Sequence, residues 1–129
     1  MEILLDTQVF LWYLMGDLRL SAKAREVINV KSGLKFSIVS LWEISIKVNI
    51  GKLQLSCPFE DLVTRLAYIN AEILPISVED TQVYRSLPLS AEHRDPFDRM
   101  LVAQTLNYSL ILVSSDEKFD LYPIRRMWA

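Results

Sequence analysis

Short apolar runs alternate with longer segments of helical periodicity along most of the chain. The apolar runs predict buried strands at Met1–Leu5, Leu34–Ser37, Glu72–Ile76 and Leu110–Ser114. The periodic segments predict helices at Thr7–Met15, Ser21–Val30, Ile38–Ile50, Phe59–Asn70, Val78–Leu87 and Pro96–Tyr108. Strands that alternate with helices are typical of a parallel sheet covered on both faces. We therefore expect an α/β protein, a three-layer α/β/α sandwich with a central, mainly parallel sheet.

The chain has 129 residues without a repeat, a linker or a break in composition, which predicts a single domain spanning residues 1–129. Hydrophobic residues make up 51% of it and charged residues 23%, so a sizeable core can form. The single cysteine, Cys57, cannot form an internal disulfide, as expected in a reducing cytosol. The sequence has no recognisable signal peptide and no apolar run of roughly 20 residues that could span a membrane. We expect a soluble, cytoplasmic protein.

Two aspartates follow predicted strands. Asp6 comes directly after the first strand, and Asp116 comes shortly after the strand Leu110–Ser114. Because α/β sheets bind ligands at the carboxyl ends of parallel strands, we expect both acids at the same edge of the sheet. Two alternatives stay open, since Asp6 could cap the helix that starts at Thr7 and Asp116 could be an ordinary loop residue.

Glu43 has an unusual position in the predicted helix Ile38–Ile50. The residues four before, three after and seven after it are all apolar, namely Val39, Ile46 and Ile50. Glu43 is therefore the single charge on an apolar stripe of the helix. A buried, unpaired carboxylate is costly and usually needs a partner charge or a metal. The alternative is a capping box with Ser40, which requires the helix to begin at that serine.

The segment from His93 to Arg99 places two acids at the start of a predicted helix. Asp95 precedes Pro96 and is the natural N-cap. Asp98 falls at the third helical position on an inward-facing side, so solvation alone does not account for it. The alternative is an acid in the first turn that interacts with the helix dipole. His93, the only histidine, is expected to be a surface residue rather than a ligand.

Together these acids suit the chemistry of a metal site. Carboxylate oxygens without a cysteine or histidine cluster favour hard cations, so we expect Mg²⁺ or Mn²⁺ rather than zinc. Such an ion lowers the pKa of a bound water, binds a phosphate and stabilises the leaving oxygen of a phosphodiester. The net charge of −2 neither excludes nor favours a nucleic acid, because four metal-bound acids would leave 12 of 16 acids against 14 Lys and Arg residues.

Four segments resemble the VapC-type toxins of the PIN-domain family. They are residues 4–7, residues 40–47 continuing into 51–53, residues 94–99 and residues 110–116, in the family's order and over almost the whole chain. The segments containing W-E-I, G-K-L and R-D-P-F-D-R are the specific ones. By this resemblance the metal ligands and catalytic acids are Asp6, Glu43, Asp98 and Asp116. Thr7 or Ser115 would support them through a hydroxyl group, and a contribution from Asp95 stays open.

The same resemblance implies a metal-dependent endoribonuclease with RNA as substrate, a homodimer, and inhibition by a cognate antitoxin protein. Gln8 stands where similar toxins often have histidine, a departure that does not touch the acids. Phe10, Trp12 and Tyr13 are candidates for lining an antitoxin groove, although an apolar helix face more often belongs to the core.

Two other functions stay open. A phospho-accepting receiver domain is also a small α/β domain with bound Mg²⁺, but it requires an acid pair after the first strand, where this chain has Asp6 alone. A catalytically inactive PIN fold would bind RNA or protein without cutting, although all four acids are intact. A metal titration combined with a nuclease assay distinguishes the three.

Overall fold

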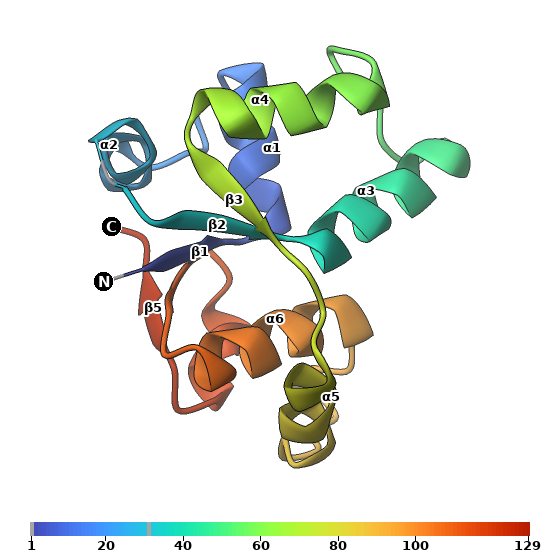
Figure 1. The fold of residues 1–129 in the computed structure, drawn as a ribbon, viewed down its shortest axis with the longest axis vertical. Coiled ribbons are helices and arrows are strands. Elements are labelled where there is room, and N and C mark those ends of the chain that lie inside the picture. Colours follow the sequence, from blue (N-terminus) through green and yellow to red (C-terminus); the bar gives the residue numbers. More distant parts are fainter. Residues whose placement is uncertain (1, 31) are drawn as a thin grey trace.

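The computed structural model describes residues 2–30 and 32–129, in which five parallel strands form one sheet (Figure 1). The strands are β1 (Ile3–Leu5), β2 (Leu34–Ser37), β3 (Ala71–Leu74), β4 (Ile111–Val113) and β5 (Arg125–Met127). Their order is β3-β2-β1-β4-β5, and every pairing is parallel. The predicted parallel α/β class is confirmed.

The direction in which the chain adds strands reverses beside β1. Strands β2 and β3 lie on one side of it, whereas β4 and β5 lie on the other. Leu5, the last residue of β1, is opposite Phe36 of β2 and Val113 of β4. Such a reversal is the point at which open α/β sheets bind ligands, just outside the carboxyl ends of the strands.

Helices cover both faces of the sheet (Figure 1). They are α1 (Thr7–Met15), α2 (Ala22–Val30), α3 (Ile38–Asn49), α4 (Leu62–Tyr68), α5 (Val78–Arg85) and α6 (Pro96–Asn107), with 3-10 turns η1 (Phe59–Asp61) and η2 (Glu117–Leu121). No helix in the described residues has the length and apolarity that a membrane crossing needs.

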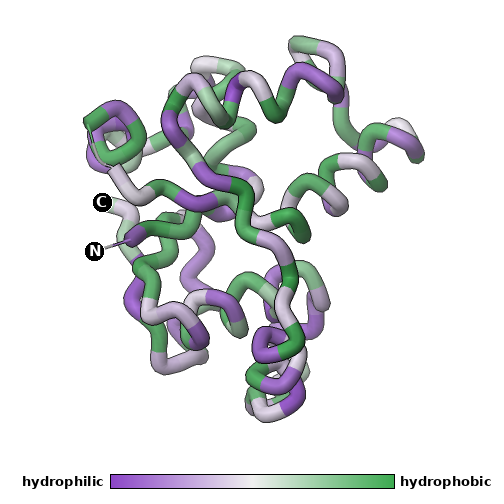
Figure 2. Tube along the Cα trace, in the orientation of Figure 1, coloured by the Kyte–Doolittle hydropathy of each residue, from purple (hydrophilic) through white to green (hydrophobic). Residues whose placement is uncertain are grey.

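Two cores lie on the two faces because successive strand side chains point in opposite directions. Ile3 and Leu5 of β1 pack in one core with residues of α1, α2, α3 and α4. Leu4, between them, packs in the other core with residues of α6 and η2 and with Leu87, which follows α5. Figure 2 shows hydrophobic positions recurring along the strands in the middle of the fold. The predicted three-layer sandwich is therefore confirmed.

The bounds of several elements are as predicted. The helix Thr7–Met15 and the strand Leu34–Ser37 are observed unchanged as α1 and β2. The predicted helix Phe59–Asn70 begins instead as the turn η1 and ends at Tyr68. The predicted first strand included Met1, which lies outside the described residues.

The apolar side of α1 belongs mainly to the core. Phe10 is completely buried and Trp12 is 9% exposed. Tyr13 is partly buried against the same core, and its hydroxyl donates a hydrogen bond to the Asn29 side chain at 3.0 Å. The core interpretation of this helix face is correct for Phe10 and Trp12.

Strand β5 is an edge strand that the hydrophobic pattern did not predict. Its first two residues are Arg125 and Arg126, and it pairs with β4. Charged residues are common on edge strands, where they discourage pairing with other chains. Arg126 donates to the Ser114 carbonyl at 3.0 Å and pairs with Asp120 at 2.9 Å. These contacts tie the edge strand to the end of β4.

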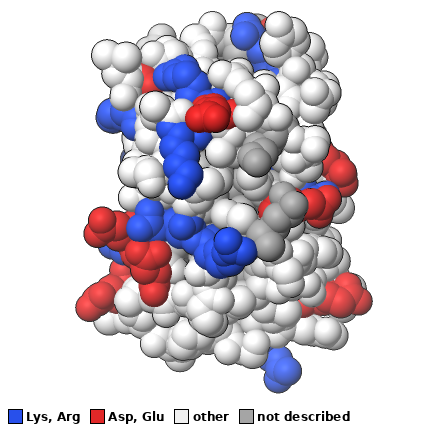
Figure 3. Space-filling model, turned by 90° about the vertical axis from the view of Figure 1, so that its left-hand side faces the viewer, with Lys and Arg blue, Asp and Glu red and all other residues white. Residues whose placement is uncertain are grey.

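Charged side chains are unevenly distributed over the surface. Figure 3 shows Lys and Arg side chains in groups, with acids beside them, on the face that lies to the left in Figure 1. Strands β1 and β2 begin on that side and run away from it (Figure 1). The carboxyl ends of these strands therefore lie away from this mixed-charge face.

Candidate active site

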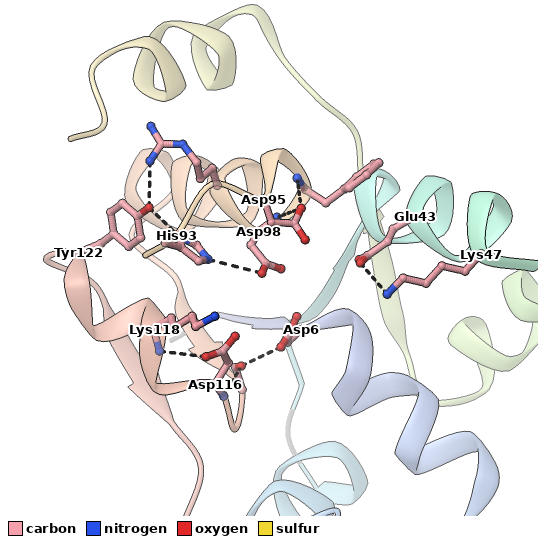
Figure 4. Close-up of polar contacts among 12 residues, drawn as sticks. Asp6, Glu43, Lys47, His93, Asp95, Asp98, Asp116, Lys118 and Tyr122 are labelled. Carbon is pink, nitrogen blue, oxygen red and sulfur yellow. Dashed lines mark hydrogen bonds and ion pairs between the residues drawn. The ribbon is translucent and has the colours of Figure 1, made fainter. Parts of the chain in front are cut away.

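An acidic cavity of about 450 Å³ lies at the carboxyl ends of β1 and β4, where the order of strand addition reverses. Its lining comes from the start of α1, the middle of α3, the start of α6 and the segment after β4. The lining residues are Asp6, Thr7, Gln8, Leu11, Trp12, Glu43, Lys47, Asp95, Asp98, Ser115 and Asp116. All four acids expected to bind metal thus face one cavity (Figure 4). The prediction that Asp6 and Asp116 share a sheet edge is confirmed.

Asp6 occupies the N-cap position of α1 but makes no side-chain capping hydrogen bond. The capping alternative is therefore wrong for this carboxylate. The residue is 8% exposed, and burial raises the pKa of its carboxyl to about 6, against the lowering effect of a hydrogen bond from Ser114. Asp6 is thus a buried acid whose anion would gain from a nearby cation.

Ser114 connects the two acids that follow strands. Its Oγ donates to Oδ2 of Asp6 at 2.7 Å and accepts from the backbone N–H of Asp116 at 3.0 Å. Ser114 is completely buried and directly follows β4, the neighbour of β1. One hydroxyl group therefore orients the carboxylate of Asp6 and holds the backbone of Asp116, two residues that follow neighbouring strands.

The hydroxyl residues predicted to support the acids were Thr7 and Ser115 and did not include Ser114. Thr7 donates from Oγ1 to the Oγ of Ser40 at 2.6 Å, which links the start of α1 to α3. Ser115 lines the cavity. A serine at the end of an apolar strand was the available signal, but its importance depends on which strand lies next to β4.

Asp116 combines a structural contact with its place in the cavity. Its Oδ1 accepts a hydrogen bond from the backbone N–H of Lys118 at 2.9 Å, so the residue caps the turn η2. Asp116 therefore caps η2 and also lines the cavity, two roles that do not exclude each other.

Glu43 is buried, 8% exposed, in the middle of α3. The helix begins at Ile38 and is capped by Ser37, so the capping-box alternative with Ser40 is wrong. Oε2 of Glu43 lies 3.0 Å from Nζ of Lys47, one turn further along. A buried carboxylate was expected to need a partner charge or a metal, and Lys47 supplies a partner charge from the same helix.

The apolar stripe around Glu43 does not stay in the core. Val39 is 3% exposed, whereas Ile46 and Ile50 are 36% and 56% exposed. Helix α3 thus leaves the sheet after Glu43, as Figure 1 also shows. This geometry places Glu43 at the boundary between core and cavity, where Lys47 can reach it.

Asp95 and Asp98 have distinct positions at the start of α6. Oδ1 of Asp95 accepts from the backbone N–H of Phe97 at 2.9 Å and from that of Asp98 at 3.5 Å, which confirms it as the N-cap. The Asp98 side chain is 22% exposed and faces the cavity. Asp98 is in the first turn of the helix, where the helix dipole stabilises an anion. The pKa of its carboxyl is nevertheless raised, so other effects outweigh the dipole.

The raised pKa of Asp98 reflects its burial and the crowding of acids in the cavity. Burial, and after it the nearby charges of Asp6, Asp95, Glu43 and Asp116, together raise the pKa of its carboxyl to about 8. A carboxylate surrounded in this way is stabilised by a bound cation.

His93 is buried, 3% exposed, so the expectation of a surface residue was wrong. Its Nδ1 is 2.7 Å from the hydroxyl of Tyr122, and its Nε2 is 3.4 Å from Oδ2 of Asp98 (Figure 4). Burial lowers the pKa of the imidazole. The partner that encloses His93 comes from 29 residues further along the chain, which explains why the local sequence did not reveal its burial.

The ligand atoms that the cavity offers are of the kind that binds a hard divalent cation. The acids provide oxygen ligands only, and their mutual repulsion is relieved by positive charge. In residues 2–30 and 32–129, however, no group of three or more His, Cys, Asp and Glu side chains has an arrangement that could already hold an ion. The cavity therefore matches Mg²⁺ or Mn²⁺ in chemistry without being a preformed coordination shell.

Fold and cavity together define an α/β protein with an acidic site at the reversal point of a parallel sheet. A model of the PIN domain matches residues 3–124, and the chain belongs to the PIN domain family. No curated protein sequence matches it.

Solved structures share the fold at low sequence identity. VapBC2 from Rickettsia felis, bound to a DNA fragment from their promoter, has a TM-score of 0.73 and 18% identity, with 100% of each chain covered. DNA-bound VapBC from Salmonella typhimurium has a TM-score of 0.70 and 18% identity, with 98% of this chain and 97% of that chain covered. A toxin–antitoxin complex from Klebsiella pneumoniae has a TM-score of 0.67 and 16% identity, with 98% and 96% covered.

Proposed function

We propose that this protein is a metal-dependent endoribonuclease that acts as the toxin of a toxin–antitoxin pair. The observation that carries the proposal is the convergence of Asp6, Glu43, Asp98 and Asp116 on one cavity from four separate parts of the fold. Membership of the PIN domain family supports nuclease chemistry, and structures of toxin–antitoxin complexes with this fold support the biological role.

In this proposal the four acids would hold Mg²⁺ or Mn²⁺, and such an ion, when bound, would lower the pKa of a water and stabilise charge on a phosphodiester. Ser114 orients Asp6 and the backbone of Asp116 through its two hydrogen bonds. Asp95 caps α6 and so places Asp98, three residues later, on the side of the helix that faces the cavity. The protein thus supplies oriented carboxylates in a partly buried site.

Lys47 is the single Lys or Arg among the described residues that line the cavity. Its side chain is 45% exposed and its ammonium group pairs with Glu43. We infer that this ammonium helps to neutralise an RNA phosphate at the mouth of the cavity, since cationic side chains supply much of the affinity for nucleic acids.

We propose two protein partners, an antitoxin and a second copy of this chain. A cognate antitoxin would inhibit the enzyme, as the similar toxin–antitoxin structures suggest. We further propose a cytoplasmic homodimer.

The receiver-domain alternative is wrong. Receiver domains have the strand order 2-1-3-4-5, whereas this sheet has the order β3-β2-β1-β4-β5. The catalytically inactive PIN alternative is decided by experiment.

The deciding experiment is an RNA cleavage assay with metal-free protein, before and after addition of Mg²⁺ or Mn²⁺, with an Asp98→Asn variant in parallel. We expect cleavage by the unmodified protein only with added metal and almost none by the variant. Undiminished cleavage after thorough chelation would exclude the metal mechanism. RNA binding without any cleavage would instead favour the inactive PIN alternative.

A further inference from the structure

A buried chain of polar side chains leads away from the cavity behind Asp98. Arg99 donates from a guanidinium nitrogen to the Tyr122 hydroxyl at 3.0 Å, and that hydroxyl lies 2.7 Å from Nδ1 of His93. Nε2 of the same imidazole lies 3.4 Å from Oδ2 of Asp98. The close-up in Figure 4 shows the part of this chain that runs from Tyr122 through His93 to Asp98.

The hydrogen bonds of Tyr122 favour one of the two imidazole nitrogens of His93 as the one that carries the proton. A guanidinium group can only donate, so the Tyr122 oxygen is the acceptor in its contact with Arg99. In the described part of the chain, Nδ1 of His93 is the acceptor available to the tyrosine's own O–H. A neutral imidazole that accepts at Nδ1 carries its hydrogen on Nε2. Tyr122 is buried, so donation of its O–H to Nδ1 is the arrangement that leaves this hydrogen paired, and it corresponds to the Nε2–H tautomer of His93.

The N–H group selected in this way points towards Asp98. Nε2 of His93 is buried and has no hydrogen-bond partner among the described residues. A buried donor without an acceptor is unfavourable, and the carboxylate oxygen at 3.4 Å is just beyond ordinary hydrogen-bond distance. A closer approach of the Asp98 carboxylate would provide this donor with an acceptor.

Packing holds the imidazole in this orientation. Its ring makes edge contacts with Phe119 and Tyr122, at centroid distances of 5.5 and 5.4 Å. Arg99 is itself fixed, because it donates to the Pro88 carbonyl at 2.9 Å and lies over the Tyr84 ring. Any other arrangement of His93, Tyr122 or Arg99 would disturb the core.

We propose that His93 is a positioning residue that holds the Asp98 carboxylate in the cavity through Nε2–H, with Tyr122 and Arg99 setting its tautomer. Groups that orient a metal-binding carboxylate in this manner raise metal affinity, and their loss typically costs about 10- to 100-fold. The inference rests on the proposed function, since it is the metal-binding role of Asp98 that His93 would support.

The first test is the tautomer, which NMR can measure without metal or substrate. His93 is the only histidine of the chain, so its ring nitrogen signals are unambiguous. We expect the Nε2–H tautomer in the unmodified protein and a loss of this preference in Tyr122→Phe. Tyr108→Phe is the matched control, because it removes a hydroxyl that contacts Ser77 at the other end of α6. A predominant Nδ1–H tautomer in the unmodified protein would overturn the inference.

The second test is Mn²⁺ affinity, measured by calorimetry on variants whose folding is checked by circular dichroism. We expect Tyr122→Phe and His93→Phe to weaken binding by about 10- to 100-fold. His93→Gln should retain most of the affinity, because its amide nitrogen can donate from a position near that of Nε2. Tyr122→Phe keeps the test valid if His93→Phe does not fold.

The outcomes separate this inference from the proposed function. Unchanged Mn²⁺ affinity in folded Tyr122→Phe, or an equal loss in His93→Gln and His93→Phe, would overturn the positioning role while leaving the metal site in place. Absence of Mn²⁺ binding by the unmodified protein would overturn the proposed function, and the role assigned to His93 with it.

Discussion

Ser114 donates a hydrogen bond of 2.7 Å to the Asp6 carboxylate across 108 residues of sequence. The bond exists because β4 lies next to β1 in the sheet, so that the residues following the two strands meet at one edge. The same hydroxyl accepts from the backbone of Asp116. A single buried side chain thus couples the two acids that lie at the centre of the proposed site.

Replacement of Ser114 by alanine should therefore weaken metal binding more than it weakens the fold. We expect a destabilisation of about 1 kcal/mol for the lost hydrogen bonds and a loss of about 10- to 100-fold in Mn²⁺ affinity. Ser115→Ala is the matched control, because Ser115 lines the cavity but is not the residue that bonds to Asp6. Calorimetric titration of both variants, with urea unfolding, measures the two effects; equal losses of affinity would contradict the assignment.

The two aspartates of α6 should respond differently to substitution by asparagine. Asp95→Asn should keep most of the RNA cleavage activity, since asparagine is also a good N-cap. Asp98→Asn should nearly abolish cleavage and leave the protein folded, because it removes a carboxylate that faces the cavity. Cleavage rates and far-UV circular dichroism of both variants test this. Equal loss of activity with equal unfolding would mean that the roles are wrongly divided.

Glu43→Gln should alter metal stabilisation more than intrinsic stability. The substitution relieves repulsion among the acids but also removes the ion pair with Lys47 one turn away, and these two effects on the metal-free protein have opposite signs. We therefore expect nearly unchanged melting without metal, and loss of the increase in Tm that Mn²⁺ gives by binding the folded state. RNA cleavage should fall by orders of magnitude.

A lysine substitution provides the control for Glu43. Lys47→Met breaks the same ion pair but keeps the carboxylate, so it should retain the Mn²⁺-dependent increase in Tm. If Glu43→Gln instead unfolds without metal and binds Mn²⁺ like the unmodified protein, Glu43 has a structural role and the site must be rebuilt from the other three acids.

The metal-free protein should become less stable as the pH rises from about 4 to about 8. The carboxyl groups of Asp6 and Asp98 have pKa values of about 6 and about 8 in the folded protein, against an ordinary value of 3.8. The folded state therefore binds more protons than the unfolded chain in this range, and its free energy of unfolding falls as those protons dissociate. Below the ordinary pKa both states are protonated and the penalty disappears.

Urea unfolding of metal-free protein at several pH values measures this dependence. Asp98→Asn should show a shallower decline, because the group with the highest carboxyl pKa is gone. The comparison is needed because the pKa of His93 is lowered by burial, which gives a slope of opposite sign below its ordinary value of 6.5. Identical slopes in the two proteins would show that Asp98 does not titrate as described.

Local pattern was sufficient for the elements that lie in the interior of the fold. Thr7–Met15 and Leu34–Ser37 have observed bounds equal to the predicted ones, since hydrophobic periodicity and capping preference act over a few neighbouring residues. The N-cap role of Asp95 was likewise readable, because Pro96 follows it directly. Strand β5 could not be predicted from the sequence, because it lies at a sheet edge and begins with Arg125 and Arg126 instead of an apolar run.

The amino-acid sequence by itself determined the α/β class and, through strand-end positions and family resemblance, the four acids that line the cavity. Only the tertiary structure decided what surrounds them. Ser114 beside Asp6 depends on the pairing of β1 with β4, and the burial of His93 depends on Tyr122 from the segment after η2. The physical reason is range: secondary structure reflects interactions between near neighbours, whereas burial and hydrogen-bond partners at a site depend on segments that meet only when the sheet assembles.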